Sequence, residues 1–181
     1  MAHTRTTPNA LLQAHLDAFE QLPSGPVLDL ACGHGRHGMT LAKRGLPVWF
    51  CDINTEALAA VQAQLDAQRL AATLWRRDLE APEVAGSPLG GRRFSAIIVV
   101  NYLHRPLLPK LAEAIMPGGL ILYETFLAAQ AEIGRPRNPD FLLQPGELIQ
   151  PFASWDRILY REGRWPDPDR FTAQLVARKP R

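Results

Sequence analysis

The chain has 181 residues, of which 46% are hydrophobic and 21% are charged, and its formal net charge is +2. This length is enough for one domain with a sizeable core, the composition excludes an intrinsically disordered chain, and the small net charge does not indicate a nucleic acid partner. No apolar run reaches the ~18 residues of a membrane helix, and the polar N-terminus has no signal core, so we expect a cytoplasmic protein without a membrane partner.

The N-terminal region is predicted to be a flexible tail over residues 1–8, and residues 9–181 are predicted to form a single domain. Asn9 suits the N-cap of a helix, because the apolar residues that follow it up to Phe19 recur at helical spacing. The stretch 23–26 contains two prolines and a glycine and is expected to end this helix.

The next segment predicts a strand, a glycine-rich loop and a helix over residues 27–44. Gly33 and Gly35 leave no side chain in the loop, and the helix that follows points its N–H groups at the same place, so a ligand can approach the backbone closely. Asp29 is unusual, because a carboxylate in a buried strand is costly unless it is paired. A cationic group of a ligand, such as an amine, would be one such partner.

Two kinds of ligand fit this loop. Gly33, Gly35 and Gly38 satisfy the G-x-G-x-x-G pattern of dinucleotide sites, whereas the acid at Asp29 favours S-adenosylmethionine (SAM), because a dinucleotide-binding strand needs no acid there. A turn without any ligand is the third possibility. The string from Asp29 to Gly35 resembles the first motif of the class I SAM-dependent methyltransferases. This resemblance implies that the loop binds SAM, with Arg36 facing the carboxylate of the cofactor.

The second predicted strand, 47–52, ends in Asp52, 17 residues after Gly35. An acid at this place can accept hydrogen bonds from both ribose hydroxyls, which SAM and NAD share. The alternative role is the N-cap of the helix predicted at 56–69, although Asn54 and Thr55 are also available for it. A third strand, 72–77, is charged and is expected at the sheet edge. The resemblance places Asp78, which follows it, at the adenine amino group.

The most hydrophobic strand, 94–100, is expected in the centre of the sheet, after a loop at 81–93. It is followed by Asn101, Tyr102, His104 and Arg105. In open α/β sheets the ligand lies beyond the carboxyl ends of the strands, where the strand order reverses. These side chains are therefore expected to face the methyl donor or its acceptor.

The C-terminal half predicts a helix, a long loop and three more strands. The loop over 130–144 carries Arg135 and Arg137 and is expected to cover the acceptor site. The last two strands are expected to form an antiparallel hairpin that closes a seven-stranded sheet. The predicted elements are a helix at 107–116, a turn at 117–119, a strand at 120–126, a helix at 147–152, strands at 156–162 and 170–178, and their turn at 163–169.

The resemblance becomes specific to one subgroup of these methyltransferases through three further stretches, 123–126, 134–143 and 145–148. They are similar to a bacterial group of small methyltransferases related to the tellurite-resistance TehB proteins, and the similarity covers roughly residues 26–179. It implies a Rossmann-like fold with a mostly parallel seven-stranded sheet, a C-terminal antiparallel hairpin and helices on both faces. The residues expected to bind SAM are Asp29, Ala31, Cys32, Gly33, Gly35, Arg36, Asp52, Ile53, Asp78, Leu79 and Asn101.

The predicted activity is in-line methyl transfer from SAM to a small-molecule acceptor, such as a thiol, a chalcogen oxyanion or a carboxylate. His104 is the best candidate for a general base. Tyr102 is expected to gate the site or to stack on a ligand. The residues expected to bind the acceptor are Tyr102, His104, Arg105, Arg135 and Arg137. The guanidinium groups of the three arginines in this set would suit an anionic acceptor. No metal site is expected. The alternatives are an RNA or protein methyltransferase, a SAM-binding module without catalysis, and an NAD(P)-dependent oxidoreductase.

Overall fold

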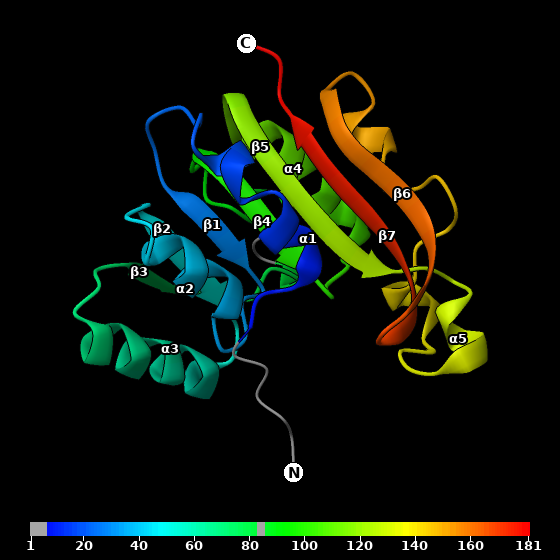
Figure 1. Ribbon diagram of the computed structural model, residues 1–181, viewed down its shortest axis with the longest axis horizontal. Helices are drawn as coiled ribbons and strands as arrows, with labels where there is room; N and C mark the ends of the chain where they lie inside the picture. Colours follow the sequence, from blue (N-terminus) through cyan, green and yellow to red (C-terminus); the bar gives the residue numbers. More distant parts are fainter. Residues whose placement is uncertain (1–6, 83–85) are drawn as a thin grey trace.

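A computed structural model describes residues 7–82 and 86–181. It forms one seven-stranded sheet with the order β3-β2-β1-β4-β5-β7-β6, in which β7 runs antiparallel to both of its neighbours and the other pairs are parallel (Figure 1). The predicted fold class is therefore confirmed. The strands are β1 (Val27–Leu30), β2 (Val48–Asp52), β3 (Thr73–Arg76), β4 (Phe94–Val100), β5 (Ile115–Phe126), β6 (Asp156–Pro166) and β7 (Asp169–Arg178).

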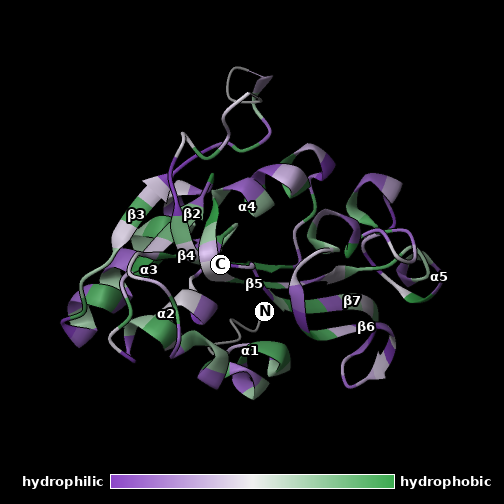
Figure 2. Ribbon diagram, turned by 90° about the horizontal axis from the view of Figure 1, so that it is seen from above, coloured by the Kyte–Doolittle hydropathy of each residue, from purple (hydrophilic) through white to green (hydrophobic). Residues whose placement is uncertain are grey.

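Helices cover both faces of the sheet (Figure 2). Leu11, Leu41 and Val61, from the three helices α1, α2 and α3, belong to the core on one face, and Leu111 of α4 belongs to the core on the other. The helices are α1 (Ala10–Ala14), α2 (Arg36–Ala42), α3 (Thr55–Gln68), α4 (Leu108–Ala114) and α5 (Gln130–Ile133), with the short 3₁₀ helices η1 (Leu16–Phe19), η3 (Arg105–Leu107), η4 (Pro139–Phe141) and η5 (Gln150–Phe152).

The central strands are apolar on both sides, which is why they read as continuous hydrophobic runs. In β4, Ile97 and Val99 lie in one core and Ala96 and Ile98 lie in the other, and all four are fully buried. A parallel strand covered by helices on both faces needs this pattern. The carboxyl ends of β1, β2 and β4 therefore meet at one rim of a rigid sheet.

The N-terminal helix is capped as expected and then changes type. The side chain of Asn9 accepts a hydrogen bond from the N–H of Leu12 and caps α1. The chain leaves the α conformation at His15 and continues as the 3₁₀ helix η1, so the predicted single helix is two short ones. Most of the tail predicted at 1–8 lies outside the described residues, as do residues 83–85 of the loop predicted at 81–93. Among the described residues, no helix combines the length and hydrophobicity needed to span a bilayer.

Three features of the C-terminal half differ from the prediction. The strand expected to start at 120 starts at Ile115, because Ile115 already pairs with Phe94 and the segment 117–119 bulges out before Leu120 pairs with Ala96. The final hairpin turns at Asp167–Pro168, so 163–166 and Asp169 extend the strands instead of forming the predicted turn. The helix expected at 147–152 is reduced to η5.

Candidate active site

The glycine-rich loop lies between β1 and α2, at the rim of the sheet where β1, β2 and β4 end. Gly35 has φ of +73°, and a Cβ atom there would lie 2.8 Å from Val61 and 3.0 Å from Phe50, so only glycine fits this turn. Ala31 also adopts a positive φ, +51°. A left-handed alanine is strained by about 1 kcal/mol, and such strain is concentrated at functional sites.

Asp29 is buried in β1 with only 2% of its surface exposed. Its Oδ2 accepts a hydrogen bond of 2.7 Å from the N–H of Gly38, in the first turn of α2. Burial raises the pKa of Asp29 to about 7, although that hydrogen bond and the charge of Arg36 act in the opposite direction. The carboxylate thus has a partner within the chain, and the amine expected from sequence would be an additional one.

Asp52 ends β2 and fixes the glycine loop from the side. Its Oδ2 accepts the N–H of Gly33 at 2.7 Å, and its Oδ1 accepts the N–H of Asn54 at 2.8 Å. Asn54 is the N-cap of α3, because its side chain accepts the N–H groups of Glu56 and Ala57. The alternative role of Asp52 as the cap of this helix is therefore wrong, and its carboxylate is held at the mouth of a cavity.

This cavity, which we call the cofactor cavity after the ligand that the sequence predicts there, has a volume of about 700 Å³, within the usual range for small-molecule sites. Five of the residues expected to bind SAM line it: Ala31, Asp52, Ile53, Asp78 and Leu79. Ile53 is 52% exposed, so a large apolar side chain is open to a ligand there. The other lining residues are Arg77, Glu80, Ala81, Pro82 and Tyr102.

A second cavity of about 430 Å³, the apolar cavity, adjoins the first, because Glu80 and Tyr102 line both. It lies beyond the ends of β4 and β5. Asn101 enters it directly after β4 with φ of +59°, so the chain turns sharply at this point. The remaining lining residues are Leu103, Thr125, Phe126, Pro136 and Phe141. The two cavities thus adjoin at Glu80 and Tyr102.

Both residues expected to be catalytic meet at a third residue that the sequence did not indicate. The hydroxyl of Tyr102 donates to Oε1 of Glu80 at 3.0 Å, and Nδ1 of His104 lies 4.0 Å from Oε2 of the same carboxylate. Burial and the neighbouring Glu80 raise the pKa of Tyr102, so its phenol stays protonated at neutral pH. Tyr102 is thus a hydrogen-bond donor here, while Glu80 and His104 are the groups able to accept a proton.

The model of a methyltransferase domain family matches residues 27–119, slightly more than half of the chain, and includes the glycine loop, Asp52, Asp78 and His104. The chain belongs to this methyltransferase family. No curated protein sequence matches the methyltransferase.

Solved structures with the same fold confirm the predicted resemblance to the class I SAM-dependent methyltransferases related to TehB. TehB from Haemophilus influenzae matches 92% of this chain with a TM-score of 0.75 and 21% identity, and the chain spans 62% of the TehB length. The magnesium protoporphyrin IX methyltransferase ChlM from Synechocystis PCC 6803, with bound SAH, matches 92% of this chain and 79% of its own, with a TM-score of 0.68 and 16% identity.

A further match comes from echinomycin biosynthesis. The structure described as the conversion of a disulfide bond into a thioacetal group during echinomycin biosynthesis covers 96% of this chain and 83% of its own, with a TM-score of 0.69 and 23% identity. Likenesses at these identities establish the fold. The family match and the fold agree with SAM, the predicted cofactor, in preference to a dinucleotide.

Arg105 of the methyltransferase is occupied by contacts within the chain. Its guanidinium binds both carboxylate oxygens of Glu147, at 2.6 and 3.1 Å, and donates to the carbonyl oxygens of Asp140 and Leu142, at 3.1 and 2.7 Å. It lines neither cavity. The geometry therefore assigns Arg105 to holding the loop 130–144, and we leave it out of the acceptor site in which the sequence placed it.

The remaining predicted residues, among them His104, line neither of the two cavities. Arg135 and Arg137 line a third cavity of about 560 Å³ with Pro136, Asn138 and Phe141. Arg36 begins α2 and influences the charge of Asp29. Cys32 lies beside the second cysteine, since its N–H donates to the carbonyl oxygen of Cys51 at 3.0 Å, and both thiols are free and buried. Among the described residues no His, Cys, Asp and Glu cluster suits a metal ion.

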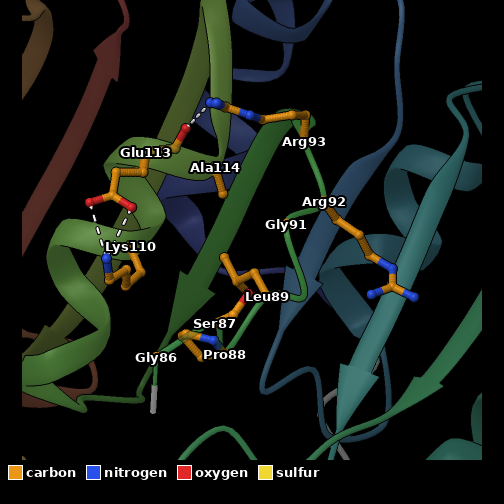
Figure 3. Close-up of a pocket in the computed structure, with 10 residues that line it drawn as sticks. All are labelled: Gly86, Ser87, Pro88, Leu89, Gly91, Arg92, Arg93, Lys110, Glu113 and Ala114. Atoms are coloured by element: carbon orange, nitrogen blue, oxygen red, sulfur yellow. Dashed lines mark hydrogen bonds and ion pairs between the residues drawn. The ribbon is translucent and has the colours of Figure 1, made fainter. Parts of the chain in front are cut away.

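A separate cavity of about 140 Å³ lies between α4 and the loop before β4 (Figure 3). Leu89 and Ala114 face each other across it, and Lys110 pairs with Glu113 on its rim. Arg93 immediately precedes β4, so this cavity is at the opposite end of that strand from Asn101. It is small and distant from the rim that carries the glycine loop, and it is not part of the active site.

Proposed function

We propose that this methyltransferase transfers a methyl group from SAM to a small-molecule acceptor by in-line displacement. The observation that carries the proposal is the continuity of the two cavities through Glu80 and Tyr102, next to a carboxylate, Asp52, that the backbone holds in place. A cavity of about 430 Å³ accommodates a small molecule. The structures reported for ChlM and for echinomycin biosynthesis likewise name small molecules.

The residues of the cofactor cavity fit the parts of SAM. Asp52 offers carboxylate lone pairs to the ribose hydroxyls, Asp78 accepts from the adenine amino group, and Ile53 supplies an exposed apolar surface for the ring. Asp29, behind the loop, gives negative charge near the amino group of the methionine part. Bound SAM supplies an activated methyl group on a sulfonium, so the chemistry of activation belongs to the cofactor.

The chain itself has to align the acceptor and remove its proton where one must leave. Tyr102 lies where the two cavities meet and Asn101 lines the apolar cavity beside it, so both are placed to orient the acceptor toward the methyl group. Glu80 lines both cavities and is placed to accept the proton of a thiol or hydroxyl, and His104, with Nδ1 4.0 Å from Oε2 of Glu80, is the next group along this route. The buried walls formed by Leu103 and Thr125 exclude water from this junction.

Calorimetric titration with SAM, S-adenosylhomocysteine (SAH) and NADH tests the cofactor. We expect micromolar binding of the first two ligands and none of NADH. Binding of NADH alone would favour the oxidoreductase. Binding of SAM without turnover on thiols, phenols or carboxylates would favour the SAM-binding module. Turnover on RNA or protein only would mean that the acceptor is a macromolecule. SAH formation is measured in each case.

We also propose that residues 9–181 form one domain and that the protein works in the cytoplasm. The single sheet, with strands from Val27 to Arg178, supports the first proposal. Free, buried Cys32 and Cys51 support the second, because unpaired cysteines are typical of a reducing compartment. Thiol titration under native and denaturing conditions measures whether both cysteines are reduced in the purified protein.

A further inference from the structure

Three cavities follow one another along the rim of the sheet. The cofactor cavity shares Glu80 and Tyr102 with the apolar cavity. The apolar cavity in turn shares Pro136 and Phe141 with the third cavity, which Arg135 and Arg137 line and which we call the arginine cavity. A ligand that starts at the cofactor and extends along this path meets first a polar junction, then apolar walls, then two guanidinium groups.

The middle of the path is built for an apolar body. Four of its eight lining residues are apolar: Leu103, Phe126, Pro136 and Phe141. Phe141 leaves 48% of its surface exposed, although water is a poor environment for an aromatic ring. Burying this ring against a flat apolar ligand would remove it from water, at about 25 cal/mol per Å² of buried area. A small inorganic oxyanion would leave these walls unused.

The far end of the path is cationic. Arg135 and Arg137 are exposed, and among residues 7–82 and 86–181 the guanidinium of Arg135 has no hydrogen-bond or ion-pair partner. Arg137 makes one long hydrogen bond of 3.4 Å to the carbonyl oxygen of Gly134. Their donors are thus available for a carboxylate, whose planar geometry matches a guanidinium.

The segment that carries these arginines is held in place from both sides. The side chain of Gln130 donates to the carbonyl oxygen of Arg135 at 3.0 Å and accepts the N–H of Phe171 at 2.8 Å. Beyond the arginines, Arg105 binds the carbonyl oxygens of Asp140 and Leu142. The backbone that carries the pair is therefore held before any ligand arrives, which lowers the entropic cost of ordering this segment on binding.

We propose that the acceptor is an aromatic carboxylate that carries its nucleophile, a thiol or hydroxyl, at the end opposite the carboxylate. This inference rests on the proposed function. The nucleophile lies at the Glu80–Tyr102 junction, the ring lies in the apolar cavity, and the carboxylate binds Arg135 and Arg137. A new S–C or O–C bond forms to the methyl carbon, the sulfonium C–S bond breaks with its electron pair going to sulfur, and the nucleophile's proton passes to Glu80 or His104.

Four probes separate the parts of this proposal. 4-Mercaptobenzoate has the ring and the carboxylate, 4-mercaptobenzamide has the ring without the charge, 3-mercaptopropionate has the charge without the ring, and tellurite is a bare oxyanion. Binding of each is measured by calorimetry on the SAH-loaded protein, and methyl transfer is measured as SAH formation. We expect 4-mercaptobenzoate to bind about tenfold more tightly than the amide, because two charged hydrogen bonds on an exposed site contribute on this scale.

Substitutions test which residues cause the preference for the carboxylate over the amide. Arg135→Gln with Arg137→Gln should bring the carboxylate and the amide to equal affinity, with SAH binding unchanged. Arg44→Gln with Arg157→Gln removes the same charge from exposed sites elsewhere and should keep the tenfold preference. Phe141→Ala should weaken both aromatic probes by a similar factor, which reports on the apolar cavity without changing charge.

Each adverse result has a distinct meaning. Equal binding of the carboxylate and the amide to the unchanged protein, or a preference that survives in the double arginine variant, overturns the inference. So does methylation of tellurite or 3-mercaptopropionate in the absence of any aromatic turnover. In all of these cases SAH still binds and the proposed function stands. Failure of the unchanged protein to bind SAH overturns the proposed function and this inference with it.

Discussion

Asp52 and Gly33 are joined by a hydrogen bond of 2.7 Å between the Oδ2 of the carboxylate and the backbone N–H of the loop. The bond ties the end of β2 to the glycine loop after β1, across 19 residues of sequence. Because the other oxygen is held by the N–H of Asn54, the carboxylate has one orientation before a ligand arrives. The loop and the acid therefore form one unit of the cofactor site.

Replacing this carboxylate should weaken SAM binding more than it weakens the fold. In Asp52→Ala we expect SAH affinity to fall about 30-fold, since hydrogen bonds to a charged group contribute about 2 kcal/mol. Asp66→Asn, an exposed change on α3, is the control and should bind normally. Calorimetric titration measures both. An unchanged dissociation constant in Asp52→Ala would remove this residue from the cofactor site.

The buried carboxyl of Asp29 predicts a pH dependence. Burial raises its pKa from 3.8 to about 7, so between these values the folded protein holds a proton that the unfolded chain has lost. The free energy of unfolding contributed by this group should therefore fall as the pH rises from about 4 to about 7 and then level off. Asp29→Asn removes this dependence and keeps the acceptor for Gly38. Urea unfolding across this pH range measures the difference between the two slopes.

Asp29 should also make cofactor affinity depend on pH, in the direction opposite to that of the free energy of unfolding. A positive amino group favours the ionised carboxylate, so SAM binding should strengthen as the pH rises through about 7. Above about 8 the amino group itself begins to lose its charge, and the gain should end. Titrations in buffers of different ionisation heat measure the protons released on binding at pH 7. Equal proton release from Asp29→Asn would contradict this assignment.

The sequence predicted the fold well because the strands differ sharply from their surroundings. The central strand β4 matches its predicted range, and the order of the sheet follows from the resemblance to a known fold. The hairpin turn was misplaced because residues 163–166 include a glycine and a proline, which are typical of turns, and an edge strand such as β6 needs no apolar alternation. Asp167–Pro168, the real turn, lies inside the predicted one.

The sequence predicted five residues that line the cofactor cavity and only part of the proposed acceptor site. Asp52 and Asp78 could be predicted because each directly follows a strand, and parallel strands bring their ends together. Glu80 could not, because its importance depends on its contact with Tyr102, 22 residues away. Arg105 was assigned to substrate for the same reason, since a loop arginine gives no sign of a partner 42 residues further on.

The contact of Glu80 with Tyr102 and His104 predicts where turnover can be lost without loss of binding. If the acceptor gives up a proton in the transition state, His104→Ala should lower kcat by about a hundredfold. Glu80→Gln should also lower kcat. In His104→Ala the affinity for SAH should stay within about twofold of that of the unchanged protein, because a twofold change is smaller than the contribution of one hydrogen bond. Glu20→Gln, at an exposed position after η1, is the charge-matched control. A kcat that is unaffected in both variants would show that neither side chain moves the proton.

The pair Arg105–Glu147 should hold the loop 130–144 against the sheet. Burial raises the pKa of Glu147, but hydrogen bonds from Arg105 and from the N–H of Gln144 outweigh it, so the pKa lies below its usual value. The stabilisation is therefore present above the unfolded pKa and is lost as the pH falls through the lower, folded value. At neutral pH, Arg105→Gln should lower the free energy of unfolding by about 1–2 kcal/mol, allowing for the exposure of the pair.

A double-mutant cycle separates this pair from its surroundings. Arg105→Lys should be almost as unstable as Arg105→Gln, because one ammonium cannot bind two carboxylate oxygens and two carbonyl oxygens together. Glu147→Gln should cost less in the Arg105→Gln background than in the unchanged protein, since the shared hydrogen bonds are already gone. Thermal unfolding gives the energies, and the rate of protease cleavage within 130–144 reports on the loop. Additive energies and an unchanged cleavage rate would mean that the loop is held by other contacts, such as the side chain of Gln130.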